Sequence, residues 1–149
     1  KRMDAARDRL GATAVLLRTG PRFRPTDKNR EFLVAFGLAV AQPDVRIVWS
    51  PSGLWDSQDL QEVAAAASMH VATDPVADGA FDPVSDWQYF RVRGLGRARL
   101  GRGDLELLAE MIQDSNDGIC ILATGDERND GRLARRLLSM VGDHEFEPS

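Results

Sequence analysis

Five short apolar runs, each followed by a turn, constrain this chain more than any other feature of its sequence. Most of the intervals between them carry apolar residues at every third or fourth position, which is the spacing of one helical face. Strands that alternate with helices predict an α/β fold with a parallel sheet and right-handed crossovers. The apolar character of the runs predicts burial on both faces of that sheet. The expected strands are residues 13–19, 45–50, 69–73, 87–93 and 118–124.

Capping residues and apolar spacing locate the expected helices. The helix over 27–41 follows its expected N-cap, Thr26, and the expected N-cap of the next helix is Asp56 or Ser57. The residues expected to face the core are Phe32, Phe36 and Val40, then Leu60, Val63, Ala64 and Ala67, then Leu105, Leu108 and Ile112, and finally Leu133, Leu137 and Val141. The remaining expected elements are helices over 3–10, 104–114 and 129–142 and loops over 74–86 and 94–103.

Two architectures agree with this alternation: part of a (β/α) barrel, or an open doubly wound sheet. A chain of 149 residues is long enough to bury its own core, and we expect a single α/β domain over residues 1–149. In both architectures ligands bind at the carboxyl ends of the strands. The residues that directly follow each strand are therefore the candidates for a functional site.

Composition narrows the function classes. The net charge of −4 argues against a dedicated nucleic-acid binder. No apolar run approaches the ~20 residues of a membrane helix, and no signal peptide opens the chain, so we expect a cytoplasmic protein without a membrane partner. Cys120 has no second cysteine to pair with and is expected to be a buried small hydrophobe. With the two histidines, His70 and His144, far apart in the sequence, we expect no metal site and no cofactor.

The segment RIVWSPSGLW is the most distinctive of the strand ends. In one interpretation its tryptophans are the walls of a small cleft, and its serines donate hydrogen bonds to a planar or sugar-like ligand. In the other, the tryptophans pack against helices and the serines cap the turn. A nucleophilic serine needs a neighbouring base, and His70 lies at the start or middle of its strand, so we expect no such catalysis. The candidate ligand contacts are Trp49, Ser50, Ser52 and Trp55.

Charged residues mark the later strand ends. The glycine- and arginine-rich loop over 94–103 departs from a dinucleotide fingerprint at Arg99 and lacks the lysine of a P-loop. The arginines near it are still suited to an anionic small molecule. If the chain is an enzyme, Arg91 holds the anion and Asp74 acts as base. The candidate ligand contacts in this half are Asp74, Arg91, Arg93 and Asp126.

Five segments, in order and spacing, resemble the YecE-like family, also called domain of unknown function 72. The first is PRFRPTDKNR (21–30), which is similar to that family's Pro-Phe-Thr-Asn turn, and the second is WSPSGLW (49–55), which is similar to W-E-P-R-G-x-W. The third is Asp74-Pro75, which resembles the Asp-Pro after the family's next strand, and the fourth is YFRVRG (89–94), which is similar to Y-F-R-L-H-G. The fifth is LATGD (122–126), which falls where the family has a strand ending in F-N-N. The resemblance implies a TIM-barrel type of fold. It also implies that this chain corresponds to the C-terminal two-thirds of the family's barrel.

Departures from the family pattern shape the expected function. Where the family carries Glu, Arg, His and paired Asn, this chain has Ser50, Ser52, Arg93 and Thr124-Gly125. We therefore expect a pseudoenzyme that acts as a binding or scaffolding module. An incomplete barrel exposes strand edges, so a second copy or a partner protein is expected to cover the open edge. The alternatives are a small hydrolase or lyase acting on a phosphorylated or sugar-like ligand, and weak nucleic-acid binding through the arginine loop.

Overall fold

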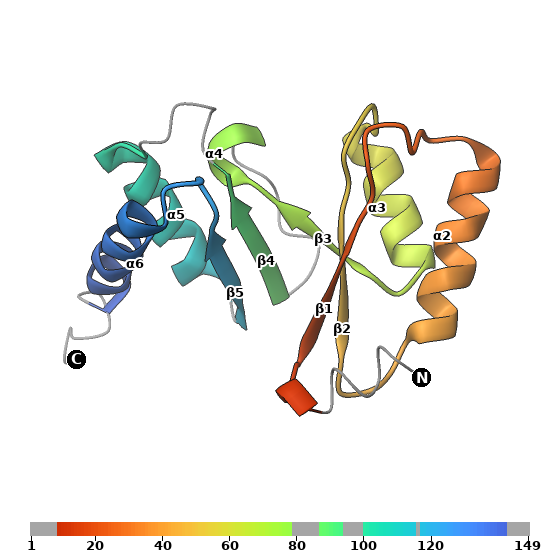
Figure 1. Ribbon diagram of the computed structural model, residues 1–149, viewed down its shortest axis with the longest axis horizontal. Coiled ribbons are helices and arrows are strands. Elements are labelled where there is room, and N and C mark those ends of the chain that lie inside the picture. The colour runs from red at the N-terminus through yellow and green to blue at the C-terminus, as the bar shows by residue number, and fades with distance from the viewer. Residues whose placement is uncertain (1–8, 79–86, 94–99, 116, 143–149) are drawn as a thin grey trace. The chain divides into compact units, whose positions relative to one another are not determined.

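The computed structural model describes residues 9–78, 87–93, 100–115 and 117–142 (Figure 1). The chain has two compact units, Lys1–Ala72 and Thr73–Ser149. The single domain expected over the whole chain stays a prediction. Most of the helix expected over 3–10, and most of the loops expected over 74–86 and 94–103, lie outside the described residues.

The first unit consists of parallel strands with a helix after each of the first two. Its elements are β1 (Ala14–Arg18), α2 (Asp27–Val40), β2 (Arg46–Ser50), α3 (Ser57–Ala66) and β3 (His70–Thr73), whose last residue already belongs to the second unit. β2 lies between β1 and β3, with Val48 opposite both Leu16 and His70. Thr26 and Asp56 cap the two helices as expected, because their side-chain oxygens accept hydrogen bonds from backbone N–H groups three residues ahead.

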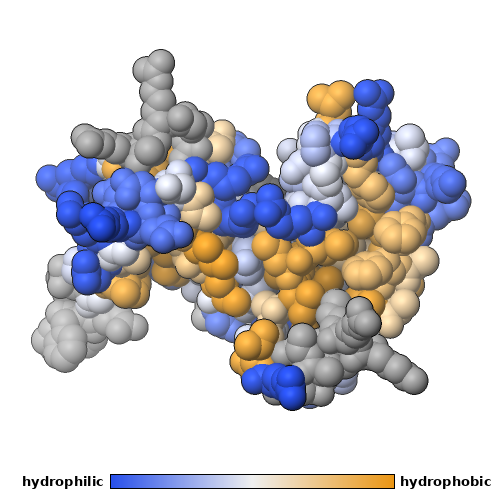
Figure 2. Space-filling model, viewed as in Figure 1, coloured by the Kyte–Doolittle hydropathy of each residue, from blue (hydrophilic) through white to orange (hydrophobic). Residues whose placement is uncertain are grey.

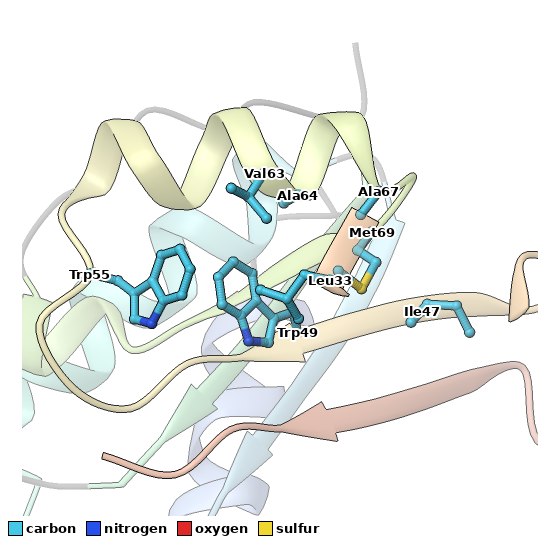
Figure 3. Packing of buried hydrophobic residues seen from close by; sticks show 8 residues of the cluster. All are labelled: Leu33, Ile47, Trp49, Trp55, Val63, Ala64, Ala67 and Met69. Atoms are coloured by element: carbon cyan, nitrogen blue, oxygen red, sulfur yellow. The ribbon is translucent and has the colours of Figure 1, made fainter. Parts of the chain in front are cut away.

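Helices α2 and α3 pack on the same face of the strands of this unit. Trp49 of β2 is fully buried there, between Leu33 of α2 and Val63 of α3 (Figure 3). Side chains alternate along a strand, so Ile47 shares this face while Val48 lies on the other. The core positions expected on α3 are confirmed as members of this cluster or as partly buried residues packed against it.

The core face expected for α2 is confirmed at Val40, which packs against the cluster, but it is wrong at Phe32. Leu33 and Gly37 are the buried residues of this helix, whereas Phe32 is 57% exposed. The reason is the close approach of the two helices: a Cβ at Gly37 would lie 2.2 Å from the Ala67 carbonyl oxygen. A stripe that contains a glycine packs tightly against the end of α3, and the phenylalanine stripe is turned towards the surface.

The second unit contains a parallel strand pair and two long helices. Its elements are α4 (Pro75–Asp78), β4 (Trp87–Val92), α5 (Arg102–Asp114), β5 (Asp117–Leu122) and α6 (Glu127–Gly142). β4 and β5 pair over their whole length, with Trp87 opposite Asp117. α5 begins two residues earlier than expected because the Asp104 carboxylate accepts the N–H of Gly101 and closes the first turn.

The core of the second unit lies between the strand pair and the two long helices. Leu105 and Leu108 of α5 are fully buried and pack with Leu133 and Leu137 of α6, which confirms the faces expected for both helices. Cys120 of β5 is partly buried against this cluster. Burial raises the pKa of its thiol to about 11, so the thiol stays protonated at neutral pH and behaves as a small apolar group.

The predicted fold class is confirmed: the chain alternates strands and helices, and the pairs β1–β2, β2–β3 and β4–β5 are parallel. Within each unit the helices that join successive strands lie on one face, together with the following helix in the second unit. Both a barrel and one half of a doubly wound sheet have this arrangement, so the geometry of each unit agrees with either alternative. Within the described ranges, no helix is both long and apolar enough to cross a membrane.

The glycine at the α2–α3 contact gives a test of this packing. We expect Gly37→Ala to lower the free energy of unfolding by about 1–3 kcal/mol, because the added methyl group overlaps the Ala67 carbonyl. Gly131→Ala in α6 is the control: a Cβ there meets nothing within 4 Å, and the gain in helix propensity predicts about 0.5–1 kcal/mol of stabilisation. Urea unfolding followed by far-UV circular dichroism measures both. Equal stabilisation by the two substitutions would contradict the close approach of α2 and α3.

Candidate functional site

Aromatic side chains pack together at the strand ends of the first unit. Trp49 and Trp55 meet edge to face with ring centroids 4.9 Å apart, and Phe23 stacks on Trp55 at 6.2 Å. The Phe32 ring meets the edge of the Phe23 ring, with centroids 6.4 Å apart, and stacks on the Phe36 ring, with centroids 6.3 Å apart. These five rings, here called the aromatic row, run from the buried end of β2 to the exposed surface of α2.

The indole N–H groups of both tryptophans are satisfied inside the unit. Trp49 Nε1 donates to Thr19 Oγ1 at 3.0 Å, and Trp55 Nε1 donates to the Phe23 carbonyl at 2.8 Å. Trp49 is fully buried and Trp55 is 9% exposed. The tryptophans therefore join the segment after β2 to the segment after β1, and neither has an N–H left for a ligand. Their expected role as cleft walls stays a prediction.

The two serines lie in the same turn as the tryptophans. Ser50 is the last residue of β2, is 9% exposed, and lies on the opposite face of the strand from Trp49. Ser52 is half-buried, and Gly53 beside it has φ +107°. A Cβ at Gly53 would lie 3.0 Å from the Pro21 carbonyl oxygen, so the Pro-x-Gly turn is required where the two segments approach.

His70 lies on the sheet face that carries Ser50, one step towards the amino end of the strands. It stands opposite Val48, which is two residues before Ser50. Burial lowers the pKa of the His70 imidazole, and the charge of Arg46 lowers it further, which favours the neutral ring. The expectation that Ser50 is not a nucleophile stays a prediction.

An ion pair that the sequence did not reveal lies against the aromatic row. The Arg30 guanidinium of α2 donates two hydrogen bonds, of 2.5 and 2.6 Å, to the carboxylate of Asp59 in α3. The same guanidinium lies 5.8 Å from the ring centroid of Trp55. The hydrogen bond to Asp59 raises the pKa of Arg30. No local signal links two residues 29 positions apart, so sequence reasoning had no means of pairing them.

Asp74 connects the start of α4 to the end of β4 in the second unit. Its carboxylate accepts the N–H of Ala77 at 3.3 Å and the N–H of Arg93 at 2.8 Å, and Arg93 Nε lies 3.5 Å from the same oxygen. The residue is only 2% exposed. The expectation of a loop directly after β3 is wrong, because the bond from Ala77 to Asp74 caps a one-turn helix that begins at Pro75.

The other two charged candidates of this unit lie apart from Asp74. Arg91 is half-buried on the face of β4 opposite the helix-covered Val92, next to Tyr89. Burial raises the pKa of the Tyr89 hydroxyl against the opposing charge of Arg91. Asp126 is exposed after β5, and its carboxylate accepts the N–H of Asn129 in the first turn of α6, which accounts for a helix start two residues earlier than expected.

The structure thus brings two pairs of the candidate residues into contact: Trp49 with Trp55, and Asp74 with Arg93. Across the described part of the chain, no three His, Cys, Asp or Glu side chains converge as they do in a metal site. A pocket of about 230 Å³ lies at the amino end of β5, away from the carboxyl ends of the strands where the candidate residues lie. Phe90, Ile112 and Gly118 are among the residues that line it.

No protein-family model matches this sequence, and comparisons with curated proteins and with solved structures gave no match. The resemblance to the YecE-like family therefore depends on its five segments alone and stays a prediction. The geometry described above is the basis for interpreting the site.

Asp74 and Asp126 each follow a strand, and substituting each one tests whether the hydrogen bonds accepted by Asp74 stabilise the second unit. We expect Asp74→Asn to lower the free energy of unfolding by about 2 kcal/mol, because the amide nitrogen replaces one of two accepting oxygens and faces a donor. Asp126→Asn is the control and is expected to change it by less than about 0.5 kcal/mol, since asparagine caps a helix as well as aspartate does. Differential scanning calorimetry with urea titration measures both variants. Equal stability of the two would show that these bonds do not hold Asp74.

Proposed function

We propose that this chain is a non-catalytic α/β binding module that presents its surface to a partner protein. One observation carries the proposal: Asp74, the carboxylate best placed to act as a base, is 2% exposed and accepts hydrogen bonds from the backbone of Ala77 and Arg93. A general base has to come within about 2.6–3.2 Å of the proton it removes. A buried carboxylate held by the fold is suited to structure rather than to proton transfer.

The other strand ends support the same proposal. The indoles of Trp49 and Trp55 donate to acceptors of their own unit, and Asp126 caps α6. Thr124, which stands where the resembled family has paired asparagines, donates its hydroxyl and its N–H to Asp130 of α6. These polar groups at the strand ends are therefore engaged in the fold.

Exposed strand edges and apolar side chains support a partner chain. β1 pairs with β2 and β5 pairs with β4, and each has that single strand partner among the described strands. An edge strand with unpaired N–H and C=O groups is a template for another chain. Ile121 of β5 is 37% exposed and Leu138 of α6 is 71% exposed, so apolar surface is available in the same unit. A partner protein or a second copy is proposed to cover such an edge.

One observation favours the enzymatic alternative, a hydrolase or lyase that acts on a phosphorylated or sugar-like compound. Arg91 is half-buried, and none of the ion pairs or hydrogen bonds of the described residues engages its guanidinium. A desolvated arginine is suited to a phosphate or carboxylate group. The arginine loop of the nucleic-acid alternative lies outside the described residues at 94–99.

A thermal-shift screen separates the two functions. We expect no compound in a panel of phosphorylated and sugar-like metabolites to raise the melting temperature, because the proposed module has no small-molecule substrate. A true ligand at 100 times its Kd stabilises by about 2.7 kcal/mol, a shift of several degrees in a chain of this size. A compound that stabilises the wild type and Arg135→Ala, an exposed arginine of α6, but not Arg91→Ala would overturn the proposal in favour of an enzyme.

A further inference from the structure

We infer that the loop after β1 and the outer face of α2 form a docking surface for a short acidic peptide segment of a partner protein. The inference rests on the proposed binding function and names the class of partner. The surface, here called the basic aromatic surface, consists of Arg22, Arg24, Lys28, Phe32 and Phe36. It has an apolar centre, a set of cations without partners, and a charge opposite to that of the rest of the chain.

The apolar centre is Phe32. Its side chain is 57% exposed, and Figure 2 shows apolar residues at the surface over α2. The ring is nevertheless held in place, because it stacks on Phe36 at 6.3 Å and meets the edge of Phe23 at 6.4 Å. A fixed aromatic ring loses little conformational entropy on binding, which makes it an effective anchor at an interface.

Three cations lie in the segments that carry Phe32 and its neighbour Phe23. Arg22 and Arg24 flank Phe23, whose ring touches Phe32, and Lys28 lies one helical turn before Phe32. All three side chains are exposed, and none forms an ion pair or side-chain hydrogen bond within the described residues. Arg30 differs from them, because it turns inward and pairs with Asp59.

Hydrogen bonds to its backbone hold the loop that carries Arg22 and Arg24 in place. The Asn29 side chain donates to the Arg24 carbonyl at 2.8 Å, and the Phe23 N–H donates to the Gly20 carbonyl at 2.9 Å. The Phe23 carbonyl in turn accepts the Trp55 indole. Arg22 and Arg24 are therefore carried by a preformed loop, which lowers the entropy lost when a partner binds.

The distribution of charge favours an acidic segment. Residues 18–36, which include the whole basic aromatic surface, hold five basic and two acidic residues, a net charge of +3, in a chain whose net charge is −4, so the remaining residues carry −7. Charged groups act over about 8 Å at physiological ionic strength, so a short acidic peptide meets the basic aromatic surface alone. A long polyanion such as nucleic acid also meets the acidic remainder and is repelled by it.

Peptide selection tests the inference with the whole chain. From a random twelve-residue display library panned on the folded protein, we expect peptides enriched in Asp and Glu around one aromatic or leucine residue. We expect Phe32→Ala to weaken binding of the selected peptides about 30-fold, as for an interface hot spot. Replacing both Arg22 and Arg24 by alanine is expected to weaken it about threefold to tenfold, and less at high salt.

Two variants control for folding and for general loss of apolar surface. Phe32→Tyr keeps the ring and is expected to retain binding. Leu38→Ala removes a side chain of α2 that is equally exposed, at 57%, and is expected to leave binding unchanged. Circular dichroism and the melting temperature show that each variant is folded, which is expected because the altered side chains are exposed.

Several results would overturn the inference. They are a selection without acidic enrichment, equal effects of Phe32→Ala and Leu38→Ala, and tighter binding of a single-stranded oligonucleotide than of the selected peptides at the same salt concentration. Sedimentation velocity that shows a dimer lost in Phe32→Ala would make a second copy the occupant. Peptides that bind elsewhere would overturn this inference and leave the binding-module proposal intact. A metabolite whose thermal shift depends on Arg91 would overturn the proposed function itself.

Discussion

The hydrogen bond from the Trp55 indole to the Phe23 carbonyl determines much of the first unit. A buried indole N–H without an acceptor is costly, so the segment after β2 has to reach the segment after β1. Gly53 permits that approach, because its backbone lies in the left-handed region beside the Pro21 carbonyl. Phe23 is then held on Trp55, and Phe32 on Phe23. The exposed ring of α2 thus owes its fixed position to a buried pair of tryptophans.

In the second unit, the carboxylate of Asp74 connects two segments that are far apart in the sequence. Asp74 joins the start of α4 to the end of β4 by accepting backbone N–H groups from Ala77 and Arg93. Because buried carboxylates are stable only when they are paired or hydrogen-bonded, the same contacts that permit its burial remove it from solvent. In both units, the residues at the strand ends that resemble a ligand site mainly connect one turn to the next. This shared property is what supports the proposed binding module, whose interactions would take place on its outer surfaces.

The sequence predicted the parts of this fold that depend on neighbours along the chain. The alternation of strands and helices, the caps Thr26 and Asp56, and the core faces of α3, α5 and α6 follow from local patterns. The buried face of α2 did not, because the helix has two apolar stripes and the choice depends on how closely Gly37 approaches Ala67. The site was less predictable. Which residue accepts the Trp55 N–H and which carboxylate pairs with Arg30 depend on contacts about 30 positions apart, which no spacing rule encodes.

Hydrogen exchange of the indole protons shows whether Trp49 and Trp55 are held inside the first unit. In assigned ¹H–¹⁵N spectra of the labelled protein, we expect the indole N–H protons of both residues to exchange far more slowly than that of free tryptophan, because both are buried and hydrogen-bonded within the unit. Exchange of either proton at the rate of free tryptophan would contradict this expectation. The strand-end tryptophans would then face solvent, and the segment RIVWSPSGLW would be open to a ligand.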